Sequence, residues 1–316
     1  MMFLSYAQNF EDVILWRALK HVENGFYIDI GAQDPVIDSV SRGFYEKGWR
    51  GLHVEPTETY AAKLRDNRPD EEVVQAAIGN GQREISFFEI PETGLSTGEL
   101  AVAELHRNNG AKIVETTVLL MPLNELFERV GSREIHWLKI DVEGMEQSVL
   151  ESWPPSSARP WIVVVESTEP NSQIPSHERW EPILLSIGYE FVHFDGLSRY
   201  YVSLERQGLK KAFGVGPNIF DNFAISGTAQ TTVAAAVNKR AEDLQNDRNN
   251  LIGLLDQQAI EISNLNISAS KSESRITELE NILAAKEVEL TKIYMSWSWK
   301  MTYPYRRFMR LFRRYK

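Results

Sequence analysis

The chain has 316 residues, of which 43% are hydrophobic and 10% aromatic, which is enough for one well-filled globular domain and a further segment. It contains no cysteine, which excludes disulfides and thiolate zinc sites, and six scattered histidines do not suggest a histidine metal cluster. The net charge of −10 is uneven, because residues 296–316 hold seven basic and no acidic side chains, and the acidic remainder argues against nucleic-acid binding.

The N-terminal stretch MMFLSYAQNFED has neither the basic region nor the apolar core of a signal peptide. No run approaches the ~18 apolar residues that a membrane-spanning helix needs. Together with the cysteine-free composition, these features predict a cytoplasmic protein.

Up to about residue 228, short apolar runs alternate with helical patterns. Strands are predicted at residues 26–30, 52–55, 73–78, 84–89, 113–120, 136–141, 161–166, 190–194 and 199–203. Helices are predicted at residues 60–67, 123–130, 145–153 and 178–187. This alternation is typical of an open α/β sheet that is mostly parallel, and ligands of such sheets bind at the carboxyl ends of the strands.

The first candidate site is FYIDIGAQDP, residues 26–35, in which a strand stops at Gly31. Its single glycine does not supply the G-x-G-x-x-G cradle of a pyrophosphate, and Asp29 would repel phosphate. Glu55 ends the next strand 24 residues after Gly31, the spacing at which an acid receives ribose hydroxyls. A nucleoside with a positive amino-acid tail fits this pattern, and S-adenosylmethionine is such a cofactor.

Other interpretations of these residues stay open. Asp29 could cap the following turn, and Glu55 could be an exposed acid at a strand end. In VVQAAIG, residues 73–79, the strand end around Ala77 could lie against the adenine or be an ordinary buried strand.

The second candidate site is WLKIDVEGMEQSVL, residues 137–150, where Asp141 ends an apolar strand and Glu143 follows two residues later. These carboxylates could orient a substrate hydroxyl, take its proton or hold a divalent cation. Glu143 could instead cap the next helix. His177, near the start of a predicted helix, is a third candidate as general base, or else a cap or surface residue.

Five segments resemble the FkbM-type family of S-adenosylmethionine-dependent methyltransferases. They are YAQNFEDVIL, FYIDIGAQDP, GWRGLHVEP, WLKIDVEGMEQSVLES and HERWEPILLSIGYEFVHFDGLSRYYV. The resemblance implies a class I methyltransferase fold with seven strands, and methylation of a hydroxyl, commonly on a sugar or related metabolite. The acceptor would then be a glycan or a sugar nucleotide.

The resemblance also implies roles for individual residues. Asp29, Gly31 and Ala32 fall in the cofactor loop, Glu55 at the ribose acid, and residues 141–144 in the family's KIDVEG motif. Gln33 stands where many members have asparagine. Tyr200, Tyr201 and Asp195 could form a wall for the acceptor, or be ordinary strand residues.

Residues 233–295 carry two interleaved rows with a period of seven. The first row is Val237, Leu244, Leu251, Gln258, Leu265, Ser272, Leu279, Lys286 and Ile293. The second row is Ala241, Arg248, Leu255, Ile262, Ala269, Ile276, Leu283 and Leu290. The pattern predicts a coiled coil that joins this chain to a copy of itself or to a partner. A solvated single helix or a disordered linker is the alternative.

The final segment, SWSWKMTYPYRRFMRLFRRYK, is predicted to form a basic amphipathic tail over residues 296–316. Tyr305, Phe308, Met309, Phe312 and Tyr315 would share one helix face, opposite Arg306, Arg310, Arg313 and Arg314. Such a helix suits an anionic membrane surface, and would place the protein at the inner face of the cytoplasmic membrane. Binding of RNA or of a partner protein is the alternative.

The ending is also similar to the S-x-SW-x-x-T-x-P-x-R endings of coiled-coil-bearing enzymes of bacterial surface polysaccharide assembly. We therefore predict an O-methyltransferase domain over residues 1–228. The alternative is a membrane-bound assembly factor that uses this domain only as a module. A nicotinamide-dependent oxidoreductase is disfavoured by the missing glycines.

Overall fold

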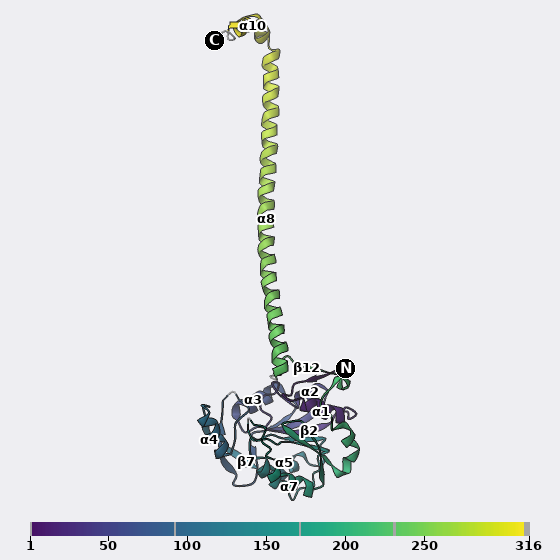
Figure 1. Cartoon of the computed structure of the whole chain (residues 1–316). Coiled ribbons are helices and arrows are strands. Elements are labelled where there is room, and N and C mark those ends of the chain that lie inside the picture. Colours follow the sequence, from purple (N-terminus) through teal and green to yellow (C-terminus); the bar gives the residue numbers. More distant parts are fainter. Residues whose placement is uncertain (1, 92, 171, 230–231, 313–316) are drawn as a thin grey trace. The chain divides into compact units, whose positions relative to one another are not determined.

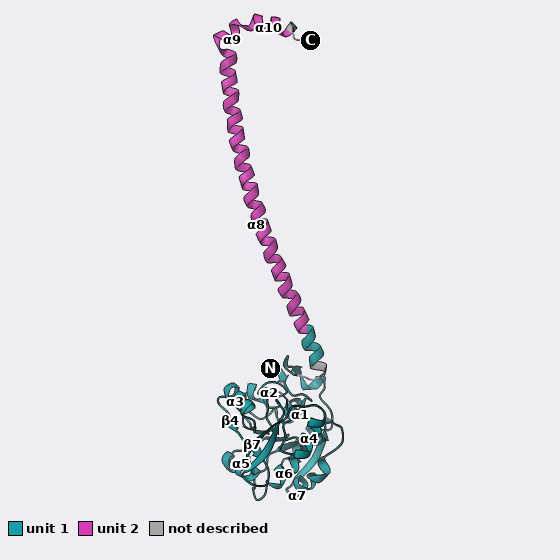
Figure 2. Ribbon diagram, turned by 90° about the vertical axis from the view of Figure 1, so that its left-hand side faces the viewer, with its two compact units in different colours: residues 1–240 teal, residues 241–316 magenta. Residues whose placement is uncertain are grey.

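The computed structural model describes residues 2–91, 93–170, 172–229 and 232–312. The chain divides into two compact units, Met1–Arg240 and Ala241–Lys316 (Figure 2). The first unit is an α/β domain with helices on both faces of a twisted sheet (Figure 1). The described part of the second unit, residues 241–312, is almost entirely helical.

The main sheet has seven strands in the order β10-β11-β9-β8-β2-β3-β4. Their bounds in that order are Tyr189–Phe194, Ser198–Ser203, Ile162–Glu166, Trp137–Ile140, Phe26–Ile30, Arg50–Val54 and Glu72–Val74. β11 is antiparallel to both of its neighbours, and the other neighbouring pairs are parallel. This is the class I methyltransferase arrangement, so the predicted fold class is confirmed.

Two small sheets flank the main one. β5 (Ala77–Ile78), β7 (Val114–Met121) and β6 (Glu84–Glu89) form a three-stranded sheet, and β1 (Phe3–Ser5) pairs with β12 (Phe223–Ile225). The prediction of one strand over residues 73–78 is wrong. The chain leaves the main sheet after β4 and joins the small sheet as β5.

Among the described residues of the first unit, seven α-helices precede α8 (Thr232–Met295). They are α1 (Glu11–Leu19), α2 (Arg42–Glu46), α3 (Glu58–Asn67), α4 (Leu100–Asn108), α5 (Leu123–Val130), α6 (Glu146–Glu151) and α7 (Glu181–Ser186). Short 3₁₀ helices lie at His177–Arg179, Leu204–Ala212 and Ile219–Asp221. The predicted helix over residues 178–187 is therefore two pieces, a 3₁₀ turn and α7.

The two faces of the sheet bury different cores, because successive side chains of a strand point to opposite faces. Ile28 and Leu138 pack with residues of α5, α6 and α7 on one face. Tyr27 and Trp137 pack with residues of α1 and α2 on the other, where their rings stack with centroids 4.6 Å apart. This stacking packs the first residues of β2 and β8 against each other, at the opposite end of the strands from Gly31 and Asp141.

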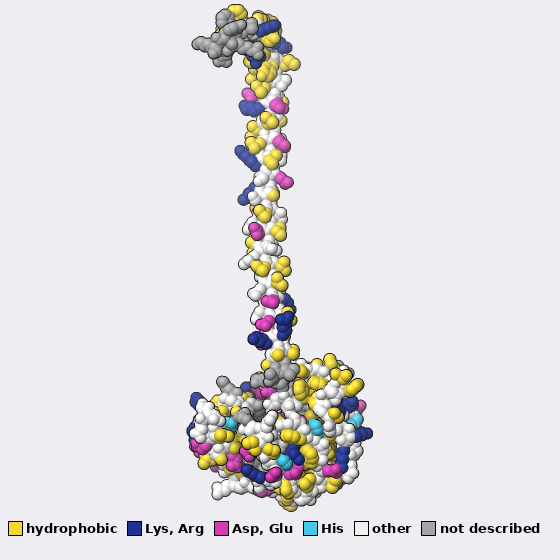
Figure 3. All heavy atoms as spheres, viewed as in Figure 1, with side chains coloured by type: hydrophobic (Ala, Val, Ile, Leu, Met, Phe, Trp, Pro, Cys, Tyr) yellow, Lys and Arg dark blue, Asp and Glu magenta, His cyan; other side chains and the backbone are white. Residues whose placement is uncertain are grey.

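Helix α8 (Thr232–Met295) is 64 residues long and is followed by α9 (Trp297–Met301) and α10 (Tyr303–Phe312). The predicted long helix is confirmed. Apolar side chains are spread along α8 (Figure 3), and those of its two rows are exposed, as in Leu255 with 64% of its surface accessible. None of the helices in the described ranges combines the length and apolar composition needed to cross a bilayer.

Gly31 lies where β2 and β8 come closest. Its φ is +78°, and a Cβ at this position would lie 1.8 Å from the carbonyl oxygen of Asp141. Neighbouring amides complete the junction, since Asp141 N donates to the Ile30 carbonyl at 3.2 Å. The glycine is required by contact within the protein itself, in addition to any contact with a ligand.

Gly31→Ala should therefore cost more than about 4 kcal/mol of unfolding free energy, or prevent folding, because backbone must move. Gly188→Ala is the matched control: its φ is +92°, but no atom lies within 4 Å of the added Cβ. It should cost only about 1 kcal/mol, the strain of positive φ. Urea denaturation measures both, and equal losses would contradict the close contact.

Candidate functional site

A cleft of about 1170 Å³ opens at the carboxyl ends of β2, β3, β8 and β9. It lies where the chain order reverses, with β3 on one side of β2 and β8 on the other. Eight of the nine predicted site residues line it: Asp29, Gly31, Ala32, Gln33, Glu55, Ala77, Asp141 and Glu143. The ninth, His177, does not.

Glu55 is fixed in one orientation directly after β3. Its Oε1 accepts hydrogen bonds from the Thr57 amide (2.9 Å) and hydroxyl (2.6 Å), and its Oε2 accepts one from the Gln33 amide (3.1 Å). Only 5% of the residue is accessible, so it is not the exposed strand-end acid of the alternative interpretation. Burial raises the pKa of Glu55, and these hydrogen bonds oppose the rise.

Gln33 adopts a left-handed backbone conformation with φ +48°, which asparagine tolerates better than most residues. Its side-chain amide donates to the Tyr60 hydroxyl at 3.4 Å. Its Oε1 also lies 3.1 Å from where a Cβ on Gly94 would be, so it touches the loop after β6. The longer glutamine side chain thus lies between α3 and this loop, both of which line the cleft.

Asp29 is 2% accessible, and its Oδ1 has no hydrogen-bond partner among the described residues. Its register neighbours are His53 on β3 and Lys139 on β8. The His53 Nδ1 lies 3.9 Å from Asp29 Oδ2. A buried carboxylate oxygen without a partner is costly, so this site is suited to receive a donor from a ligand.

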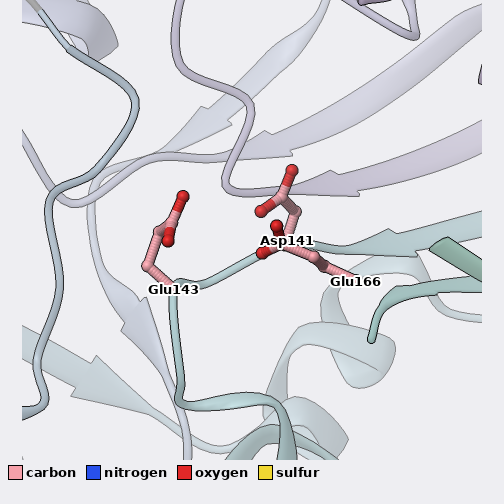
Figure 4. A group of neighbouring side chains, drawn as sticks. All are labelled: Asp141, Glu143 and Glu166. Atoms are coloured by element: carbon pink, nitrogen blue, oxygen red, sulfur yellow. The ribbon is translucent and has the colours of Figure 1, made fainter. Parts of the chain in front are cut away.

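Asp141, Glu143 and Glu166 form the acidic cluster (Figure 4), in which one carboxylate oxygen from each lies within 4.8 Å of the others. The Lys139 ammonium lies 2.7 Å from Asp141 Oδ2. Burial favours the neutral form of Asp141, but the charge of Lys139 and the hydrogen bonds from Glu166 and Lys139 together outweigh it and lower the pKa of Asp141. One ionised carboxylate is thus paired with one buried ammonium.

The other two acids of the cluster hold their protons more strongly. Burial, together with the charges of Asp141 and Glu146, raises the pKa of Glu143 to about 8. Burial and the charge of Asp141 raise the pKa of Glu166 well above its usual value. Glu143 also has a left-handed backbone with φ +51°, a strain that is common at functional sites.

The cluster offers oxygen ligands of the type that Mg²⁺ or Ca²⁺ prefers. Lys139 already supplies a positive charge to Asp141, so holding the acids together does not require a cation. Lys139 and Glu166 were not predicted as site residues. The sequence did carry a signal for Glu166, because it is the last residue of an apolar strand. Glu55 and Asp141, which were predicted, directly follow the last residues of their strands.

Two groups of predicted residues lie away from the cleft. His177 packs against Trp180, with its Nε2 4.0 Å from Glu181, which is not the position of a base acting in this cleft. Tyr200 and Tyr201 are fully buried, and their hydroxyls donate to Asp195 (2.7 Å) and Glu181 (2.8 Å). They are strand residues of the core and form no acceptor wall.

The raised pKa values predict a pH dependence of stability. Burial raises the pKa of Glu146 to about 7, alongside Glu143 at about 8, whereas unfolded glutamates titrate near 4.3. Their stabilising neutral forms are fully present below the unfolded pKa and lost as pH rises through 7 to 8. The protein should therefore unfold at a lower temperature at pH 9 than at pH 6.

Glu143→Gln should reduce this difference by a few degrees, because the amide cannot ionise, whereas the exposed Glu151→Gln should leave it unchanged. Differential scanning calorimetry at both pH values measures the effect. An unchanged difference in Glu143→Gln would show that Glu143 does not titrate in this range.

The family model described as "Methyltransferase FkbM domain" matches residues 29–191, over half of the chain. Comparison with curated protein sequences returns no match.

Two crystal structures are similar. One is a TehB-like SAM-dependent methyltransferase from Corynebacterium glutamicum (7% identity, 60% of this chain and 87% of that one, TM-score 0.35). The other is an O-methyltransferase from Bacillus cereus in complex with SAH (12% identity, 61% and 80%, TM-score 0.32). On the family match over residues 29–191, this chain belongs to the FkbM family of methyltransferases.

Proposed function

We propose that this methyltransferase uses S-adenosylmethionine to methylate a hydroxyl group of a sugar or surface-glycan precursor. One observation carries the proposal: a single cleft holds a fixed ribose-type acid, Glu55, and a separate acidic cluster around Asp141. A volume of about 1170 Å³ exceeds the usual upper range of ~1,000 Å³ for one small ligand. The cleft therefore has room for a cofactor and an acceptor together.

The residues on the β2 and β3 side fit the cofactor. Oε2 of the fixed Glu55 carboxylate keeps one acceptor site free and would accept a hydrogen bond from a ribose hydroxyl. The unpartnered Oδ1 of Asp29 would receive the positive amino-acid tail, directly or through water. The turn at Gly31 and Ala32, with Ala77 on β5, would contact the nucleoside. When bound, the cofactor supplies a methyl group already activated by its sulfonium.

The residues on the β8 and β9 side fit a hydroxyl acceptor. Asp141 is ionised and held by Lys139, so it can accept the hydrogen bond that orients the acceptor oxygen. Glu143, with a pKa of about 8, is poised to exchange a proton near neutral pH. Neighbouring carboxyl groups also match the several hydroxyls of a sugar. The mechanism assigns no step to a divalent cation.

Glu55→Gln should weaken binding of S-adenosylmethionine at least about tenfold, because an amide nitrogen repels one of the hydroxyl donors. Isothermal titration calorimetry measures this. Glu58→Gln on α3, an exposed acid three residues later, is the control and should bind as the wild type does. Unchanged affinity in Glu55→Gln would remove the ribose assignment.

We further propose that the tail binds an anionic membrane surface, which would place the enzyme at the inner face of the cytoplasmic membrane. On α10, Tyr305, Phe308 and Met309 are exposed and share one side, with Arg306 and Arg310 on the other. Trp297 of α9 is 78% accessible. The predicted contributions of Arg313, Arg314 and Tyr315 lie outside the described residues. RNA or protein binding is the competing role.

Changing Arg306, Arg307 and Arg310 to glutamate should abolish flotation of the full chain with anionic vesicles. A control with the same charge change places glutamate at Lys239, Lys271 and Lys292 of α8, and should float as the wild type does. Flotation that persists in the tail variant would contradict the membrane role. Vesicles of zwitterionic lipid should recover little of either protein.

A second candidate function is a membrane-associated assembly factor for polysaccharide synthesis. It is favoured by the length of α8, which carries many apolar side chains that contribute nothing to the cleft. It predicts that cells with Asp141→Asn keep normal surface glycan, whereas a chain ending at residue 228 does not. The enzymatic proposal predicts that both lose the methylated product or its correct placement.

A further inference from the structure

The two heptad rows of α8 leave a long apolar surface unpaired in a single chain. Leu251, Leu255 and Ile262 are 59–64% accessible, and the same exposure recurs from Val237 to Ile293. Soluble monomers rarely expose continuous apolar surface of this extent. A partner helix that covers both rows would remove it from water, at about 25 cal/mol per Å² of apolar surface.

Charged residues within the rows restrict what this partner can be. Arg248 interrupts the second row and Lys286 interrupts the first. Each has an acidic neighbour in sequence: Asp247 precedes Arg248, and Glu287 follows Lys286. Both acidic residues are at positions that border the interface of a coiled coil.

A parallel coiled coil in register places these charges favourably. A second-row residue such as Arg248 then packs beside the residue that precedes its counterpart, which is Asp247 of the other copy. A first-row residue such as Lys286 packs beside the residue that follows its counterpart, which is Glu287 of the other copy. Both basic layers are neutralised, without any need for a different protein.

In the fully overlapped antiparallel arrangement, Thr232 of one copy lies beside Met295 of the other, and first-row residues face second-row residues. Arg248 then faces Leu279 of the other copy and Lys286 faces Ala241, so each basic residue is opposite an apolar one and its charge is not neutralised there. One flanking pair also agrees with the parallel arrangement, in which Arg275 reaches Glu280 of the other copy.

Two strands are favoured over three or four. Leucine occupies four first-row positions, Leu244, Leu251, Leu265 and Leu279, which is the residue type that two-stranded coils favour there. The second row mixes isoleucine with leucine and does not by itself set the number of strands; these residues are Ile262, Ile276, Leu255, Leu283 and Leu290. A dimer also lets the Arg248 and Lys286 head groups leave the core at its edge, whereas larger bundles would bury them.

We propose that α8 pairs two copies of this chain as a parallel, in-register coiled coil whose basic core layers are neutralised by Asp247 and Glu287 of the opposite copy. Both tails then emerge at the same end of the coil. Tail binding to a membrane becomes bivalent, which raises affinity without new contacts in either tail. The dimer itself does not depend on the proposed catalytic function.

The absence of cysteine makes the geometry directly testable in the full chain. Leu244→Cys should form a disulfide-linked dimer under mild oxidation, because the two copies of residue 244 face each other. Glu242→Cys, on the outward side of the helix, should not. In the fully overlapped antiparallel arrangement residue 244 faces residue 283, so mixed Leu244→Cys and Leu283→Cys chains would form the heterodimer instead.

Light scattering of the wild type should give the mass of two chains. A monomer at micromolar concentration, three or more chains, or preferential formation of the mixed disulfide would each overturn the proposal. If the chain forms a complex only when another protein is added, α8 pairs with that protein instead of with a second copy. That result would also overturn the proposal.

Charge variants test the neutralised layers. Glu287→Lys should raise the dissociation constant of the dimer about tenfold in sedimentation equilibrium, since two symmetric ion pairs become repulsions. Glu242→Lys makes the same charge change away from the interface and should alter it less than about twofold. Circular dichroism checks that α8 stays helical in both. Equal effects of the two variants would contradict the assigned contacts.

Discussion

The contact between Gly31 and the carbonyl of Asp141 is the constraint on which the site depends. The positive φ of Gly31 turns the chain away from β2 while the end of β8 passes within the space that a side chain would fill. The cofactor side of the cleft and its acidic cluster are therefore joined through one backbone contact. A shift at this junction would move Asp141 relative to Glu55. The proposed acceptor position would then no longer be aligned with the proposed cofactor position.

Charge burial is the second requirement of this architecture. Asp29, His53 and Lys139 occupy matching positions on adjacent strands, on the sheet face that also carries α1. Lys139 serves the acidic cluster, and its electrostatic influence extends to Glu11 of α1. Burial and the charge of Asp195 raise the pKa of Glu11 to about 8. Several buried acids around Lys139 are therefore held in the protonated form. A polar acceptor that hydrogen-bonds to them would reduce the free-energy cost of burying them.

Much of the fold follows from local pattern. The bounds of β2, β6 and α5 agree with prediction because glycine, proline or charged residues mark their ends. The break between β4 and β5 is marked only by Gln75, without the glycine, proline or charged residue found at the other ends, and the pairing of β5 with β7 reveals it. Helix α1 was missed because residues 13–15 are apolar without a polar face, which reflects burial rather than helical period.

In the candidate site, too, local sequence predicts some features and tertiary packing decides the others. Acids at strand ends are visible in sequence, so Glu55 and Asp141 could be predicted together with their cleft. Side-chain direction is set by packing, which is why His177 could not be placed: its ring packs beside Trp180. The partnership of Lys139 with Asp141 was missed although strand alternation places residues two apart on one face. What the sequence does not show is that this face buries the ammonium beside the carboxylate.

The enzymatic account is tested most directly by methyl transfer. Wild-type protein incubated with methyl-labelled S-adenosylmethionine and fractionated cell glycans should place label on a glycan hydroxyl, and Asp141→Asn should lose this transfer while still binding the cofactor. Label appearing equally with both proteins, or on no glycan fraction with the wild type, would contradict the claim that the cleft is a glycan O-methylation site.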